Sequence, residues 1–234
     1  MAGGEETIPH NANRVGLGTW ADICFAGRGM RFRARPGPDA QLDRKAVCSM
    51  GHGGDVIEEL TADHREVDEL FDRIEAVPAR GSERRRLLDQ LTIELVRHSV
   101  AEEQHLYPAV REYVPRGDAL ADKEIADHRR VERLLKDLEG MDADDPELIH
   151  LFVKLRTEVR AHVQDEEGNL FIQLRAACGP EVLDLLGQEV RMAKETAPTR
   201  PHPGAPSSPL ASKILSPGLG LVDRVRDFIT GRGE

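Results

Sequence analysis

Apolar residues recur every three or four positions from residue 55 to residue 195, which is the period of an amphipathic helix. Gly and Pro interrupt this pattern and divide it into predicted helices at 55–77, 83–113, 118–139, 146–177 and 181–195. Ser82 is expected to cap the second helix, and Pro146 suits the first turn of the fourth. Pro108 is expected to kink the second helix or end its regular part, because proline lacks an N–H.

The two ends of the chain lack this long helical pattern. Residues 1–49 are rich in Gly, Arg and Pro and are predicted to form a disordered extension, upstream of a true translation start at Met50. Residues 196–217 are dense in Pro and Ser and predict a linker. Residues 218–234 predict a short amphipathic helix, whose apolar stripe could dock on the bundle, on a partner or on a membrane surface. That stripe is formed by Leu221, Val222, Val225, Phe228 and Ile229.

Composition narrows the class of protein. Aromatic residues make up only 4% of the chain, which favours a helical protein with an aliphatic core. The formal net charge is −10 and no continuous basic face is present, so no nucleic-acid partner is expected. No apolar run is long enough for an integral membrane segment. The three cysteines form no CxxC pair, which predicts a reduced, cytoplasmic protein.

An internal repeat relates the first and second predicted helices to the third and fourth. His64, His98 and Glu102 each have an identical residue 64 positions later, at His128, His162 and Glu166. The same offset relates further pairs: Asp63 and Asp127, Glu94 and Glu158, Glu103 and Glu167, Leu106 and Leu170, and Tyr107 and Phe171. So many matches at one offset without a gap indicate two copies of one helical hairpin.

The repeated residues have the chemistry and spacing of metal ligands. His98 and Glu102 are four residues apart and therefore share one helix face, as do His162 and Glu166. His64 and His128 lie within the apolar stripes of their helices. Burying these groups without partners would cost several kcal/mol. Imidazole and carboxylate suit iron, zinc or manganese, so the set predicts an inward-facing pair of metal ions in a four-helix bundle.

Other residues near this set have less defined roles. His105 lies on the face of His98, but its counterpart in the second copy is Asn169, which weakens a ligand role. Glu94 and Glu158 each precede a candidate His by four residues and are expected to accept hydrogen bonds from its ring N–H. Tyr107 could bond near the site or serve only in packing.

The segment from His98 to Glu103, followed by Leu106-Tyr107-Pro108, resembles the H-x-x-x-E-E…YP signature of hemerythrin-like domains. The second copy, His162-x-x-x-Glu166-Glu167, completes a resemblance that covers about residues 55–177. The resemblance implies an antiparallel up-down-up-down bundle with two iron ions joined by an oxo or hydroxo bridge. In the family, such centres bind dioxygen, handle peroxide or nitric oxide, or sense iron and oxygen.

The sequence also departs from oxygen-carrying hemerythrins. Those proteins have a fifth His one turn before the third-helix His, where this chain has Glu124, which could be a seventh ligand. They also use a fourth-helix Asp, spaced differently from Glu166. A site richer in carboxylate is expected to favour redox chemistry over reversible oxygen carriage.

Three functions remain open at this level. The first is a non-haem di-iron protein that binds or senses dioxygen, nitric oxide or iron. The second is a di-iron enzyme that disproportionates peroxide, in which the metals act as Lewis acids and exchange electrons. The third is a bundle with a vestigial site that only holds a partner, and the complete ligand set argues against it. The oligomeric state is open.

Overall fold

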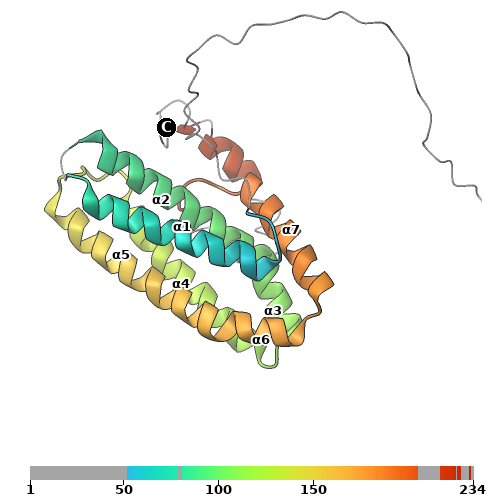
Figure 1. Cartoon of the computed structure of the whole chain (residues 1–234). Coiled ribbons are helices and arrows are strands. Elements are labelled where there is room, and N and C mark those ends of the chain that lie inside the picture. Colours follow the sequence, from blue (N-terminus) through green and yellow to red (C-terminus); the bar gives the residue numbers. More distant parts are fainter. Residues whose placement is uncertain (1–51, 79–80, 205–216, 225, 228–231, 233–234) are drawn as a thin grey trace, which may run out of the picture. The chain divides into compact units, whose positions relative to one another are not determined.

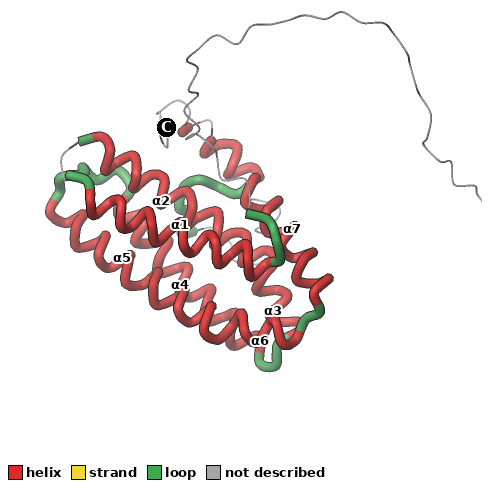
Figure 2. Tube along the Cα trace, viewed as in Figure 1, coloured by secondary structure: helices red, strands yellow, loops and turns green. Residues whose placement is uncertain are grey.

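The computed structural model describes residues 52–78, 81–204, 217–224, 226–227 and 232. Residues 1–51, which include the predicted start at Met50, and residues 205–216 of the predicted linker lie outside these residues. Regular structure in the described part is helical throughout (Figure 2). Its elements are α1 (Val56–Ala76), α2 (Ser82–Ala101), η1 (Glu102–Leu106), α3 (Tyr107–Tyr113), α4 (Gly117–Leu138), α5 (Pro146–Asp165), η2 (Glu166–Leu170), α6 (Phe171–Ala177) and α7 (Pro180–Thr196).

Four long helical arms form an antiparallel bundle (Figure 1). The first arm is α1 and the third is α4. The second arm runs from α2 through η1 to α3, and the fourth runs from α5 through η2 to α6. Helix α1 packs along α2, and α4 packs along α5, so each copy of the repeat is one helical hairpin. The predicted all-α, up-down-up-down bundle is confirmed.

The helix ends follow local capping chemistry, with one correction. The Asp55 side chain accepts from the backbone N–H groups of Ile57 and Glu58, and Glu58 bonds back to Asp55, which is a complete capping box. Pro146 occupies the first turn of α5 behind the capping Asp145, as predicted. Ser82 is not a cap: it is the first residue of α2, and Gly81 with a φ of 131° precedes it.

Two π-helical turns interrupt the second and fourth arms. In η1 the backbone N–H of Tyr107 donates to the carbonyl of Glu102, and in η2 Phe171 donates to Glu166. Pro108 lies in the first turn of α3, directly after η1, so the regular α-helix ends shortly before it, as predicted. Ile172 occupies the equivalent position in the second copy, so a π-turn forms there without proline.

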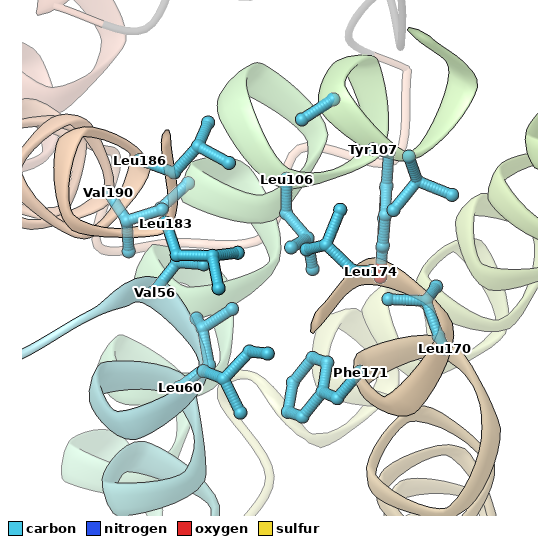
Figure 3. Close-up of a cluster of buried hydrophobic side chains, with 14 of the residues drawn as sticks. Val56, Leu60, Leu106, Tyr107, Leu170, Phe171, Leu174, Leu183, Leu186 and Val190 are labelled. Atoms are coloured by element: carbon cyan, nitrogen blue, oxygen red, sulfur yellow. The ribbon is translucent and has the colours of Figure 1, made fainter. Parts of the chain in front are cut away.

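The core is divided into two apolar clusters. One cluster includes Val67, Leu91, Val131 and Leu155. It lies between α2 and α5, which precede the π-turns, and the parts of α1 and α4 that face them. The other lies around α3, α6 and α7, and Figure 3 shows Leu183, Leu186 and Val190 of α7 facing the α1 residues Val56 and Leu60. A layer of buried histidines and carboxylates is interposed at the level of the π-turns.

The described residues after α7 are folded onto the bundle. Of the expected 196–217 linker, residues 197–201 are buried, and the backbone N–H groups of Thr199 and Arg200 both donate to Asp223. Arg200 forms ion pairs with Asp227 and with Glu139, the residue that caps the C-terminal end of α4. These residues therefore differ from a flexible linker because buried polar contacts fix their backbone.

The described part of the C-terminal helix covers residues 217–224, 226 and 227, so Val225, Phe228 and Ile229 of the predicted stripe lie outside the described residues. Asp223 and Asp227 are buried, whereas Leu221 and Val222 are 61% and 64% exposed. Gly220 lies so close to the end of α7 that a Cβ at this position would clash with the carbonyl oxygen of Thr196. No helix among the described residues is both long enough and apolar enough to cross a membrane.

Candidate metal centre

The six predicted ligands meet in the buried layer between the two apolar clusters. Their exposed fractions lie between 0% and 6%. Potential ligand atoms form two groups: His64, His98, Glu102 and Glu166 in one, and Glu102, His128 and His162 in the other. We call these the first and the second metal position. Because each hairpin contributes its two histidines to one position, the internal repeat produces two adjacent sites.

The two carboxylates lie between the two histidine pairs. The Nε2 atoms of His64 and His98 are 3.3 Å apart, and those of His128 and His162 are 3.2 Å apart. One oxygen of Glu102 lies 3.1 Å from His98 Nε2, and the other lies 3.2 Å from His128 Nε2. Glu166 Oε2 is 3.5 Å from the Nε2 atoms of both His64 and His162. Both glutamates are therefore placed to bridge a pair of cations.

Each candidate histidine has a carboxylate on its outer nitrogen. The Nδ1 atoms of His64 and His128 lie 2.9 and 3.2 Å from Glu167 and Glu103, which are equivalent residues of the two copies. Such a partner fixes the ring with Nδ1 protonated and leaves the Nε2 lone pair facing inward. The EE pair of the motif thus has two roles, because its first glutamate faces the metal positions and its second orients a histidine.

The outer partners of the other two histidines differ between the copies. His98 Nδ1 lies 3.1 Å from Asp63 Oδ2, and His162 Nδ1 lies 2.8 Å from Glu124 Oε2. Glu124 is fully buried. It contacts Nδ1 of His162, whereas Nε2 of His162 faces His128, so Glu124 is not part of the second position's group.

The expected partners Glu94 and Glu158 do not fill this role. Asp63, Glu103, Glu124 and Glu167 take the outer nitrogens instead, and Glu158 accepts from Arg130. A residue four positions before a histidine lies one turn along the same helix, whereas the outer ring edge faces a neighbouring helix.

The electrostatics of the layer favour bound positive charge. Burial by itself lowers the pKa of His98, but the charge of Glu102 and the hydrogen bond to Asp63 outweigh it and raise the pKa to about 10. Burial likewise opposes protonation of His128, yet hydrogen bonds to Glu102 and Glu103 raise its pKa to about 10. The hydrogen bond from His64 lowers the pKa of Glu167 to about 2. In the metal-free protein, the raised pKa values of His98 and His128 favour a proton on each of these two rings beside Glu102.

Tyr107 adds a hydroxyl to the layer. Its oxygen donates to Glu166 Oε1 at 3.0 Å and lies 3.1 Å from His128 Nε2. The π-turn accounts for this position, because it places the fifth residue after Glu102 on the face where a regular helix would place the fourth. The equivalent Phe171 has no hydroxyl and stacks on His64, with ring centroids 5.9 Å apart.

His105 does not join the cluster. Its Nδ1 lies 2.9 Å from Glu189 of α7. The π-turn between His98 and His105 inserts an extra residue and rotates the rest of the arm by about 100°, so the seven-residue spacing no longer keeps the two histidines on one face.

A small cavity adjoins the four histidine rings on the side away from Tyr107. Its volume is about 20 Å³, which suits one molecule of the size of water. Aliphatic side chains form most of the remaining wall: Val67, Leu95, Val131, Val159 and Val163.

The layer fits a pair of metal ions on two further counts. Glu102 Oε1 and Glu166 Oε2 are buried and face imidazole nitrogens, at 3.1 Å from His98 Nε2 and at 3.5 Å from the Nε2 atoms of His64 and His162, so each contact requires a proton or a cation. The donor set is imidazole nitrogen with carboxylate oxygen, which suits iron, manganese and zinc.

Comparison with known proteins agrees with this geometry. The hemerythrin HHE cation-binding domain matches residues 55–174, a little more than half of the chain. The chain belongs to the hemerythrin HHE family. This HHE domain therefore carries a buried His/Glu cluster of the kind that suggests a di-metal site.

Two relatives and one solved structure are similar to this HHE protein. An uncharacterized hemerythrin-like protein of Schizosaccharomyces pombe is 26% identical over 71% of this chain and 82% of its own length. A DNA nickase of a Nostoc species is 29% identical over 58% of this chain, but the match spans only 38% of the nickase. The crystal structure of an HHE cation-binding domain-containing protein from Mycobacterium kansasii is 25% identical, with a TM-score of 0.54, and the match covers 60% of this chain and 85% of that one.

Proposed function

We propose that this HHE protein binds two iron ions and uses them to bind or sense a small ligand, either dioxygen or nitric oxide, or to sense iron itself. The observation that carries the proposal is the orientation of the four histidines. All four have a carboxylate at Nδ1, and their Nε2 atoms converge in pairs around two buried glutamates. Facing acceptor atoms repel one another unless a cation or a proton lies between them.

Each residue has a defined part in this proposal. His64 and His98 would hold one ion, His128 and His162 the other, and Glu102 and Glu166 would bridge the two. Asp63, Glu103, Glu124 and Glu167 would keep the rings in the required tautomer. Bound iron would supply Lewis acidity and electron exchange at this place. Glu124 is proposed as an orienting residue rather than a seventh ligand.

The neighbouring cavity supports a small, weakly polar ligand. Its walls are aliphatic apart from the histidine rings and Ser99, and its volume admits a diatomic molecule but not a metabolite. The cavity therefore favours the binding function.

Peroxide disproportionation is the second candidate, and Tyr107 is the feature that favours it. Peroxide chemistry needs a proton near the reacting oxygens, and the Tyr107 hydroxyl lies within hydrogen-bond distance of Glu166 and His128. Oxygen evolution from peroxide by the iron-loaded protein would support the enzyme, and its absence would support the binder.

The first test is metal content together with the near-ultraviolet and visible spectrum of iron-supplemented protein. The test variant is His64→Ala combined with His128→Ala, which removes one histidine from each position. The matched control is His105→Ala, because His105 also pairs with a carboxylate but lies outside the cluster. We expect two irons per chain in the parent and the control and a large loss in the double variant. A parent that binds no metal would leave the histidines with a structural role.

A further inference from the structure

A buried lysine on α7 neutralises two buried carboxylates on α1. Lys194 is 6% exposed, and its Nζ lies 2.8 Å from Glu59 Oε1 and 2.5 Å from Asp63 Oδ1. Lysine is rarely buried to this extent unless it is paired. Lys194 lies twenty residues beyond the part of the chain that the HHE domain matches, which ends at residue 174.

The contact leads directly to the first metal position. Asp63 uses one oxygen for Lys194 and the other for Nδ1 of His98. The chain of contacts from Lys194 through Asp63 to His98 therefore joins α7, α1 and α2. It ends on the ring whose Nε2 lies 3.1 Å from Glu102.

In the second position, the corresponding support of His162 lies within the second hairpin. Glu124, the outer carboxylate of His162, accepts from Lys123 on the same helix at 3.0 Å, and this lysine side chain is 47% exposed. Lys123 occupies the place that Glu59 has in the first copy. The lysine that neutralises the supporting carboxylate therefore belongs to the second hairpin itself, whereas for the first hairpin this lysine comes from α7.

We propose that Lys194 is a positioning residue for the first metal position, so that docking of α7 and metal binding by His64 and His98 stabilise each other. The inference rests on the proposed di-metal function. Without Lys194, Glu59 would keep its pair with Arg191, but Asp63 would keep only a 3.5 Å contact with His52 on that oxygen and would be held less firmly as the acceptor for His98. His98 would then lose its fixed orientation.

Helix α7 has other contacts that hold it in place when Lys194 is changed. Leu183, Leu186 and Val190 belong to the apolar cluster (Figure 3). A Cβ at Gly187 would lie 2.8 Å from the Gly54 carbonyl oxygen, which shows how closely α7 approaches the start of α1. Arg191 also donates to that carbonyl and pairs with Glu59, so it anchors α7 to α1 through Glu59 rather than through Asp63.

The test is an anaerobic titration of the full chain with ferrous iron. In Lys194→Met, which keeps the length of the side chain but removes its charge, we expect one of the two binding steps to weaken by about 10- to 100-fold and the other to stay unchanged. Arg191→Met is the matched control, since it weakens the α7 anchor while leaving the Lys194–Asp63 pair in place, and both of its binding steps should match those of the parent. Two unchanged steps in Lys194→Met, or an equal loss in Arg191→Met, would overturn the proposal.

A second measurement uses the unaltered protein. Coupling between two events is reciprocal, so saturation with ferrous iron should slow hydrogen exchange of the α7 amides. Identical α7 exchange with and without the metal would overturn the inference even if Lys194→Met failed to fold. A parent that bound no ferrous iron would overturn the di-metal function, whereas two parent-like steps in Lys194→Met would overturn only the role of Lys194.

Discussion

The first copy of the repeat, from α1 to α3, and the second, from α4 to α6, place identical candidate ligands in different surroundings. In the first copy Asp63 orients the second histidine of the hairpin, and in the second copy Glu124 does so. Leu60 stands where the second copy has Glu124, and Tyr107 stands where it has Phe171. The residues that face the metal positions are thus repeated, as are the supports Glu103 and Glu167, whereas the support of the second histidine differs between the hairpins.

The external cover of the two copies differs as well. Helix α7 packs on α1 and α2 through an apolar face and a buried lysine. The segment after α7 reaches α4 through polar contacts, where Arg200 pairs with Glu139 and the His202 N–H donates to Glu132. The two candidate metal positions therefore differ in their cover although their candidate ligands are equal.

The largest expected effect comes from Glu102, because it belongs to both candidate positions. The substitution Glu102→Gln keeps the shape of the side chain but removes the charge that bridges the two sites. We expect most of both ions to be lost, as measured by elemental analysis of the purified protein. Retention of two ions would show that the positions are independent of each other and would remove the bridging role.

Exchanging Glu124 for the residue of the other copy should affect one position only. In Glu124→Leu the Nδ1 of His162 loses its acceptor, so we expect about a 10- to 100-fold weaker second position and an unchanged first one. The measurement is the ferrous-iron titration used for Lys194→Met. If the two variants weakened the same binding step, the assignment of the supports to separate positions would be wrong.

The tyrosine can be tested by making the first copy resemble the second. In the metal-free protein, Tyr107→Phe removes a donor from a buried carboxylate, which should lower the free energy of unfolding by about 1–3 kcal/mol. Urea denaturation of parent and variant measures this difference. Tyr113→Phe is the control, because Tyr113 is 41% exposed, and a change within about 0.5 kcal/mol is expected there. An equal effect of both substitutions would argue that the Tyr107 hydroxyl is not bonded in the layer.

The smallest effect is a pH dependence of the polar cover on the second copy. Burial opposes ionisation of Glu139, but Lys136 and Arg200 outweigh it and lower its pKa below the usual 4.5. A lowered carboxylate pKa stabilises the folded state above the unfolded pKa, and this stabilisation is lost as pH falls through the folded value. We expect acidification below about pH 4.5 to expose residues 197–202 to hydrogen exchange before the apolar face of α7. In Arg200→Gln, residues 197–202 should exchange rapidly already at neutral pH. If α7 and residues 197–202 lost their protection at the same pH, the two covers would not differ in their response to acid.

The sequence alone determined the bundle and the inward-facing residues. The apolar period defined the helical arms to within a few residues, and the constant offset of 64 showed that they form two equivalent hairpins. The spacing of His98 and Glu102 was enough to place both on one face, because regular helix geometry converts a spacing of four into proximity. These features follow from contacts between residues close in sequence.

The tertiary structure decided the features that depend on a local change of helix type or on contacts between helices. The π-turns move Tyr107 into the layer and His105 out of it, and no apolar period marks a single inserted residue. The partners of the outer ring nitrogens come from neighbouring helices, which is why the spacing of four pointed wrongly to Glu94 and Glu158. Lys194 lies 131 residues from Asp63, and only the packing of α7 on α1 brings its charge to the first metal position.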